Sequence, residues 1–181
     1  MAKTEKNPSR VVTDKVRLSY PRLFTPEAME EGGTAKYSAS LIIPKDNLDL
    51  LAKIEKAIQH AYQQGKAKFG GTLPKKWDSP LRDGDEDRDE DEAYQNSMFI
   101  NPKSTRKPEV VDRDLNVILD EEEVYPGCYV RAGVTFYAYN FNGKKGVAVS
   151  LDTVQKYEDG DRLGASGASA EDDFADDPMF Q

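Results

Sequence analysis

The sequence has little of the chemistry on which most catalytic and metal sites depend. Its 181 residues include a single cysteine, Cys128, and a single histidine, His60. One cysteine cannot form an internal disulfide, and Cys128 stands among apolar residues, so we expect a small core residue of a cytosolic protein. One histidine without a second histidine or a cysteine makes neither a zinc site nor a catalytic pair.

Long apolar runs are also missing. No run reaches the length of a membrane span, and the first residues, MAKTEKNPSR, contain no hydrophobic region. We therefore expect neither membrane insertion nor secretion. Hydrophobic residues make up 38% of the chain and charged residues 32%. This composition and length suit one domain with a buried core and polar appendages.

The formal net charge of -8 is unevenly distributed. Segments 83–92 and 158–181 each hold eight acids and one base, whereas the rest of the chain carries a charge of +6. Blocks of like charge repel themselves, stay disordered and often act as interaction tails. The sequence thus predicts a mildly basic body with two appendages, an acidic loop at 83–92 and a disordered acidic tail at 158–181.

The most regular pattern lies at residues 129–156. Every second residue of its first half is small or apolar, the alternation resumes in its second half, and Asn142-Gly143 stands between them. Period-two alternation is typical of a strand, and Asn-Gly tolerates the positive φ of a tight turn. We predict a long β-hairpin with one apolar face and a bulge near Asp152-Thr153.

The other face of this hairpin carries tyrosines and cations. Aromatic rings interleaved with cations suit a ligand in which flat bases alternate with anionic phosphates, as they do in single-stranded nucleic acid. Two further basic segments, KAKFGGTLPKK and PKSTRKP, could contact its backbone. The alternative is that the tyrosines pack beneath a helix or a second protomer. The candidate binding residues are Tyr129, Arg131, Tyr137, Tyr139, Phe141, Lys144, Lys145, Lys75, Lys76, Trp77, Lys103, Arg106 and Lys107.

Weaker alternation marks other strands, and one segment has a helical period. A first strand is expected to begin at Val16 and to be ended by Pro21 and Pro26. Apolar residues at 50–62 recur at spacings of three and four, which predicts an amphipathic helix capped by Asp46 and stopped by Gly65. Further strands are expected at 37–43, 98–100, 110–111 and 117–119.

This order of elements predicts the fold. Strand, strand, helix, strand and a final hairpin is not the alternation of a parallel α/β sheet. We therefore predict a mainly β fold, an OB-type Greek-key barrel with one main helix. Barrels of this type bind nucleic acid strands on one face. The predicted domain spans 14–157, after a flexible lead at 1–13, and residues 160–167 have the composition of a linker.

Two near-matches to ligand motifs lack an essential residue. Gly71 stands where a phosphate loop requires lysine. In the acidic loop, Arg88 replaces the glycine and Tyr94 the glutamate of a calcium loop. We expect a solvated loop, no metal and no cofactor. Two alternatives stay open: a metal-dependent nuclease that uses the acidic loop, and an adaptor whose barrel binds protein.

Three stretches together resemble a known family. VRLSYPRLF, GCYVRAGVTFYAY and GVAVSLDTVQKYEDGDRLG are similar to segments of phage-encoded single-stranded DNA-binding proteins, once catalogued as a domain of unknown function. The resemblance covers about residues 11–164. It implies an OB-fold protein, not an enzyme, that coats single-stranded DNA during phage replication or recombination in the cytoplasm of the bacterial host.

The C-terminus is similar to the acidic tails by which single-strand-binding proteins recruit replication enzymes. Here Gln181 follows the last aromatic residue, so the ring and the terminal carboxylate belong to different residues. The resemblance implies replication or recombination proteins as partners, and self-association stays open. The candidate partner-binding residues are Asp172, Asp173, Phe174, Asp176, Asp177, Pro178, Met179 and Phe180.

Overall fold

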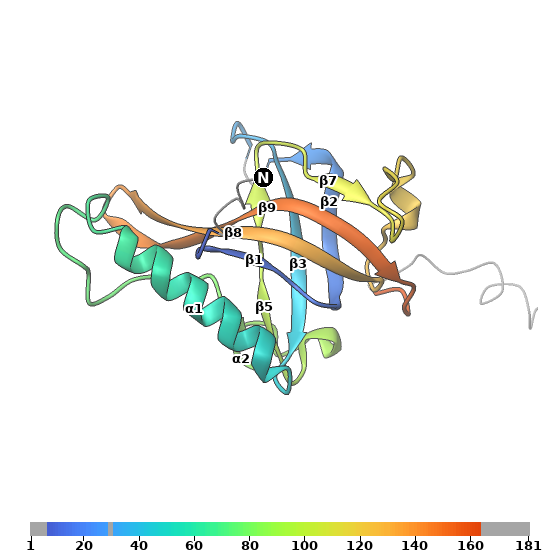
Figure 1. Cartoon of the computed structure of the whole chain (residues 1–181), viewed down its shortest axis with the longest axis horizontal. Coiled ribbons are helices and arrows are strands. Elements are labelled where there is room, and N and C mark those ends of the chain that lie inside the picture. The colour runs from blue at the N-terminus through green and yellow to red at the C-terminus, as the bar shows by residue number, and fades with distance from the viewer. Residues whose placement is uncertain (1–6, 29–30, 164–181) are drawn as a thin grey trace, which may run out of the picture.

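A computed structural model describes residues 7–28 and 31–163 (Figure 1). The strands are β1 (Arg10–Val12), β2 (Val16–Glu27), β3 (Lys36–Pro44), β4 (Arg82–Asp83), β5 (Ser97–Ile100), β6 (Lys103–Ser104), β7 (Glu109–Val111), β8 (Tyr129–Phe141) and β9 (Lys144–Glu158). The helical elements are α1 (Leu48–Gln64), α2 (Gly84–Asp87) and two 3-10 turns, η1 (Glu92–Tyr94) and η2 (Glu121–Glu123).

Five strands close into a barrel. β2 pairs with β3, β3 with β6, β6 with β9, β9 with β8, and β8 returns to β2. All these pairings are antiparallel except the short contact of β6 with β9. β1, β5 and β7 extend the sheet beside β8, β3 and β9. The predicted mainly β, OB-type barrel with one main helix is confirmed.

The predicted hairpin is formed by β8 and β9. Its two-residue turn has positive φ at both Asn142 (50°) and Gly143 (86°), as a tight hairpin requires. Gly133 pairs with Thr153 while Val134 pairs with Leu151, so one residue of β9, Asp152, is unpaired. The bulge expected near Asp152-Thr153 is confirmed, and it bends the hairpin around the barrel.

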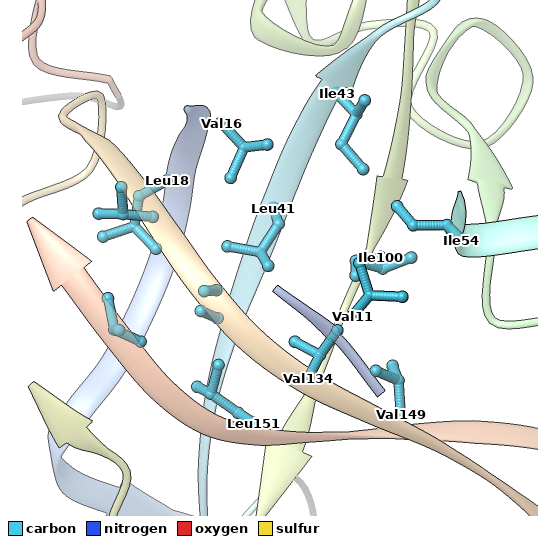
Figure 2. Close-up of a cluster of buried hydrophobic side chains, with 14 of the residues drawn as sticks. Val11, Val16, Leu18, Leu41, Ile43, Ile54, Ile100, Val134, Val149 and Leu151 are labelled. Atoms are coloured by element: carbon cyan, nitrogen blue, oxygen red, sulfur yellow. The ribbon is translucent and has the colours of Figure 1, made fainter. Parts of the chain in front are cut away.

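The apolar face of the hairpin lies in the core (Figure 2). Side chains of β2, β3, β5, β8 and β9 meet there with the buried side of α1, as Leu18, Leu41 and Val134 illustrate. Cys128 is fully buried in this cluster. Burial raises the pKa of its thiol, which keeps the thiol protonated and unreactive, so its expected core role is confirmed.

The helix α1 packs against β8 and β1 (Figure 1). It stops at Gly65 as predicted, where the Gly65 amide donates to the Tyr62 carbonyl oxygen. The predicted N-cap is wrong: the side chain of Asn47, not of Asp46, accepts a hydrogen bond from the Leu50 amide. Asn and Asp cap about equally well, so sequence alone does not separate neighbours of these types.

Two predicted strands and the predicted N-terminal lead differ from the structure. β2 is not ended by Pro21 and Pro26 but contains both and continues to Glu27, because register shifts after Ser19 and after Arg22 accommodate the prolines. The lead expected to be flexible contains β1, whose Val11 is buried against Val134 of β8. The strand expected at 117–119 is reduced to a single bridge between Val117 and β7.

The acidic segment is folded and not disordered as expected, although most of its carboxylates are exposed to solvent as predicted. Lys45 Nζ lies 2.9 Å from an Asp83 carboxylate oxygen and 2.7 Å from one of Asp85. The Tyr94 hydroxyl donates to Ser40 Oγ at 2.7 Å, and the Tyr94 ring meets Phe99 edge-on at 5.0 Å. This small second core holds α2 and η1 against the outer face of β3 and β5.

The folded body also extends past the predicted boundary at residue 157. The Leu163 amide donates to the Pro126 carbonyl oxygen at 2.8 Å, and Arg17 donates to the Asp161 carbonyl oxygen at 2.8 Å. Tyr125 contacts Asp159 and Gly160 through its hydroxyl. The first residues of the predicted tail therefore belong to the body. Residues 164–181, with all candidate partner-binding residues, lie outside the described residues.

Candidate nucleic-acid interface

A groove of about 600 Å³ lies on the outside of the barrel, between the hairpin and the segments 78–82 and 101–105. Tyr137 and Tyr139 line it from β8. Three cations line it from other elements: Lys36, Arg82 and Lys103. With two aromatic rings and three cations against one carboxylate, that of Asp78, this groove has the chemistry of a single-strand binding surface.

The two tyrosines differ in exposure. The side chain of Tyr137 is 43% exposed, so no described element covers it. Tyr139 lies deeper, and burial followed by the nearby charge of Asp78 raises the pKa of its hydroxyl. The Tyr139 hydroxyl is therefore neutral at physiological pH and is able to donate a hydrogen bond. Tyr137 offers an open ring face, while Tyr139 offers an edge and a polar tip.

Backbone hydrogen bonds position the wall opposite the tyrosines. The Asp78 amide donates to the Lys145 carbonyl oxygen at 3.1 Å, and the Val147 amide donates to the Asp78 carbonyl oxygen at 3.0 Å. Asp78 thus forms an isolated parallel bridge with Gly146 of β9. This pairing brings Arg82, four residues later, to the groove edge, where it also lies 3.6 Å from the Asp87 carboxylate.

Three candidate residues make contacts with other residues of the folded chain. Arg131 Nε donates to the Thr13 carbonyl oxygen at 3.0 Å, which holds the end of β1. Trp77 stacks on Tyr62 with ring centroids 4.6 Å apart, so its ring packs against α1. Lys15 Nζ lies 4.9 Å above the ring of Tyr129, far along β8 from the groove. These contacts engage Arg131, Trp77 and Tyr129 within the fold, and a role for them in binding stays a prediction.

The other candidates surround the groove or the hairpin tip. Phe141 is 71% exposed beside Lys144 at the tip. Arg106 and Lys107 are exposed in the turn after β6, and Lys107 Nζ lies 5.5 Å from the ring of Phe24. Lys75 and Lys76 are exposed in the segment before Trp77, and Lys145 is half-buried at the start of β9. Their roles in binding stay predictions.

Sequence reasoning missed two groove residues, Lys36 and Arg82. Lys36 opens β3, and Arg82 forms β4, which pairs with β5. Neither stands in a basic run or in an aromatic pattern, so no local signal marks it. The groove collects them because strands distant in sequence become neighbours when the barrel closes.

The described residues contain no group of three or more His, Cys, Asp or Glu side chains that could hold a metal ion. Three acids of the segment 83–92, Asp83, Asp85 and Asp87, form ion pairs with Lys45 or Arg82. Over 7–28 and 31–163, no helix is long and apolar enough to cross a membrane.

Solved structures share this architecture. The single-stranded DNA-binding protein from bacteriophage Enc34, solved in complex with ssDNA, matches with a TM-score of 0.78 at 24% identity, over 90% of this chain and 97% of its own. Gp2.5, a single-stranded DNA-binding protein encoded by bacteriophage T7, matches with a TM-score of 0.61 at 15% identity, over 92% of this chain and 93% of its own. These similarities establish the fold.

Sequence similarity is more specific. A protein designated p50, from Acyrthosiphon pisum secondary endosymbiont phage 1, is 33% identical over 95% of this chain and 96% of its own length. The family described as Enterobacter phage Enc34, ssDNA-binding protein, matches residues 9–180. This family consists of DNA-binding proteins and not of enzymes, so the nuclease alternative is set aside. The chain belongs to the family of the Enterobacter phage Enc34 single-stranded DNA-binding protein.

Proposed function

We propose that this protein binds single-stranded DNA, with little sequence preference, in the groove beside the hairpin. The observation that carries this proposal is the convergence of Tyr137 and Tyr139 with Lys36, Arg82 and Lys103 in one groove. Every base has a π-face, so stacking on tyrosine does not depend on sequence. Lysine and arginine neutralise phosphates, which adds affinity that is also independent of sequence.

Family membership supports the same ligand. The related Enc34 protein has been solved with ssDNA, and the match to its family extends over 9–180 of this chain. A phage protein of this kind acts where single strands are exposed, during DNA replication or recombination. We assign coating of such strands as its role.

The proposal also includes the acidic C-terminal residues. After Leu163 the chain carries five acids and no base, and it ends in DDPMFQ. A tethered polyanion competes with DNA for the cations of the groove, and DNA that displaces it frees it for partners. Replication or recombination proteins are the expected partners, with Phe180 as the anchor.

One titration tests the proposed function. The full chain is mixed with labelled oligothymidylate and with a duplex of the same length, with and without magnesium, and anisotropy and strand length are followed. We expect a rise in anisotropy that is larger for the single strand, with both strands intact. Cleavage that requires magnesium would contradict the proposal, and so would an unchanged anisotropy, which would point to the protein-binding adaptor.

A further inference from the structure

A second groove, of about 590 Å³, lies on the outer face of β2. Tyr20, Phe24 and Tyr125 line it with Arg22 and Arg162. It shares with the first groove a mixture of aromatic and cationic side chains. Tyr20 is 51% exposed, which is more than the 43% of Tyr137 in the first groove.

The two grooves are connected by one row of paired residues across the outside of the barrel. Residues paired directly in neighbouring strands point to the same face of a sheet. Lys103 and Ser150 belong to the first groove, Arg22 belongs to the second, and only Ser38 stands between Lys103 and Arg22. Two strand spacings, about 10 Å, separate the two cations along this row. The row runs Thr135, Ser150, Lys103, Ser38, Arg22.

Tyr20 lies two residues before Arg22, the last residue of this row. It lies in the irregular part of β2 between Ser19 and Arg22, with a φ of 44° that bulky residues rarely adopt. The Arg88 guanidinium carbon lies 5.4 Å from the ring centroid of Tyr20, and it also lies 5.5 Å from that of the buried Tyr94. A ring supported by a cation that is itself anchored on a core is a preorganised stacking platform.

We propose that Tyr20 is a second base-stacking subsite for the same strand of DNA that binds at Tyr137. Single-stranded DNA would cross the outer face of the barrel along the paired row, from the hairpin groove to the groove on β2. This inference rests on the proposed function, and it extends the site beyond the hairpin to the outer face of β2.

The charges of the second groove determine how it contributes. Glu121 and Glu122 line its wall, and Arg22 is paired with Glu27. These carboxylates offset the cations, so phosphate binding contributes less here than in the first groove. The subsite should therefore add affinity through stacking, which does not release counterions and leaves the salt dependence of binding unchanged.

The test is a series of oligothymidylates from about 4 to about 16 nucleotides, the range of sites on OB folds, titrated with the full chain. Tyr20→Asn removes the ring, and Asn tolerates positive φ, so the backbone is preserved. We expect Tyr20→Asn to bind the longest oligonucleotides about 5- to 150-fold more weakly, the loss of one stacked base. The shortest oligonucleotides, which fill only the first groove, should bind to Tyr20→Asn as tightly as they bind to the wild-type protein.

Two variants serve as controls. Tyr20→Phe keeps the ring and should bind every length as wild type does. Tyr157→Asn removes a tyrosine whose ring centroid also lies near a cation, 4.3 Å from the Arg113 guanidinium carbon, but which lines neither groove. It should change no affinity. If Tyr20→Asn binds the longest oligonucleotides as wild type does while Tyr137→Ala binds them weakly, the second subsite is wrong and the proposed function stands. If wild type binds no length, the proposed function fails.

A measurement on the wild-type chain covers the case in which Tyr20→Asn does not fold. Long oligonucleotides that carry 5-iodouracil at each position in turn are crosslinked by light, and the modified peptides are identified by mass spectrometry. We expect adducts on Tyr20 from one end of the oligonucleotide and on Tyr137 from the other. Adducts on Tyr137 or Tyr139 without any on Tyr20 would overturn the second subsite.

Discussion

Tyr139 of β8 is the direct cross-strand partner of Gly146 of β9. A Cβ atom added at Gly146 would lie 2.8 Å from the Tyr139 hydroxyl oxygen and 2.6 Å from the Asp78 carbonyl oxygen. Side-chain carbons do not approach other atoms so closely. Glycine at this position therefore lets the tyrosine ring lie across β9 and lets residue 78 pair with the same strand, so both walls of the first groove depend on it.

Gly146→Ala should damage both stability and binding. The backbone at Asp78 cannot move as a flexible side chain would, so we expect a loss of about 1–3 kcal/mol in the free energy of unfolding, typical of overpacking. Single-strand affinity should fall because the ring of Tyr139 is displaced. Thermal unfolding and anisotropy measure the two effects. In a double-mutant cycle, Gly146→Ala should cost less in the Tyr139→Ala background. A melting temperature equal to that of wild type would contradict this account.

Tyr137→Ala should lower single-strand affinity and leave the fold intact. The ring is half-exposed, and a stacked base contributes about 1–3 kcal/mol. Anisotropy at fixed salt measures the affinity, and thermal unfolding checks the fold. Tyr139→Ala should weaken binding by a similar amount, together with some loss of stability because its ring is more buried. Wild-type affinity in both variants would show that this face of the hairpin is structural.

Lysines at the interface should act through phosphates. Lys36→Gln removes a groove cation, and Lys144→Gln removes one from the exposed hairpin tip. Each phosphate contact contributes about 0.7 to the slope of log K against log salt for single strands, so each variant should flatten that slope by at most about this amount. Lys53→Gln, on the exposed side of α1, is the matched control. Slopes equal to wild type in both interface variants would remove these lysines from the path of the DNA.

The ion pairs of Lys45 should make stability depend on pH through Asp85. The hydrogen bond from Lys45, and then that from the Asn96 amide, lowers the pKa of this carboxyl from its usual 3.8. The folded state favours the ionised carboxylate of Asp85. The carboxylate therefore stabilises the fold fully above the usual pKa, and this stabilisation is lost as the pH falls through the lower pKa of the folded state. Asp85→Asn should lower the melting temperature at pH 7, and the difference from wild type should shrink below about pH 3.8.

Glu90→Gln provides the control, since Glu90 is an exposed acid of the same segment that forms no ion pair within the described chain. It should melt as wild type does at both pH values. Charge alone suggests that deletion of residues 85–92 is harmless or raises affinity for DNA. The contacts of Asp85 with Lys45 and Asn96 instead predict that this deletion destabilises the protein. A difference between Asp85→Asn and wild type that persists unchanged at low pH would show that the carboxylate charge is not its cause.

Truncation after Leu163 should raise single-strand affinity at low salt. This end point keeps the contacts of residues 158–163 with the body, which truncation after Tyr157 would remove. The competition is electrostatic, so it should fade as the Debye length shrinks from about 30 Å at 0.01 M to about 8 Å at physiological ionic strength. Titrations of full-length and truncated chains across a salt series measure it. Phe180→Ala, which removes no charge, should leave DNA affinity unchanged and weaken partner recruitment. Equal affinities at the lowest salt would contradict the competition.

The sequence by itself determined the local architecture. The β8–β9 hairpin, its Asn142-Gly143 turn, its bulge at Asp152 and the helix that ends at Gly65 were all predicted. Each depends on interactions between residues close in the chain: the period of apolar side chains and the φ values that particular residues tolerate. The family resemblance could be recognised for the same reason, because its specific part lies in this hairpin.

Only the tertiary structure decided which outward side chains share a site. Lys36 and Arg82 reach the groove through the pairing of β3 and β4 with other strands, which leaves no local signal. Arg131 and Trp77 look equally suitable in sequence, but the Thr13 carbonyl and the Tyr62 ring occupy them. A charged or aromatic side chain takes whichever partner the tertiary structure brings near, and these partners lie outside the range of local sequence patterns. Periodicity therefore predicts the face on which a residue lies, whereas long-range pairing determines what that residue is free to bind.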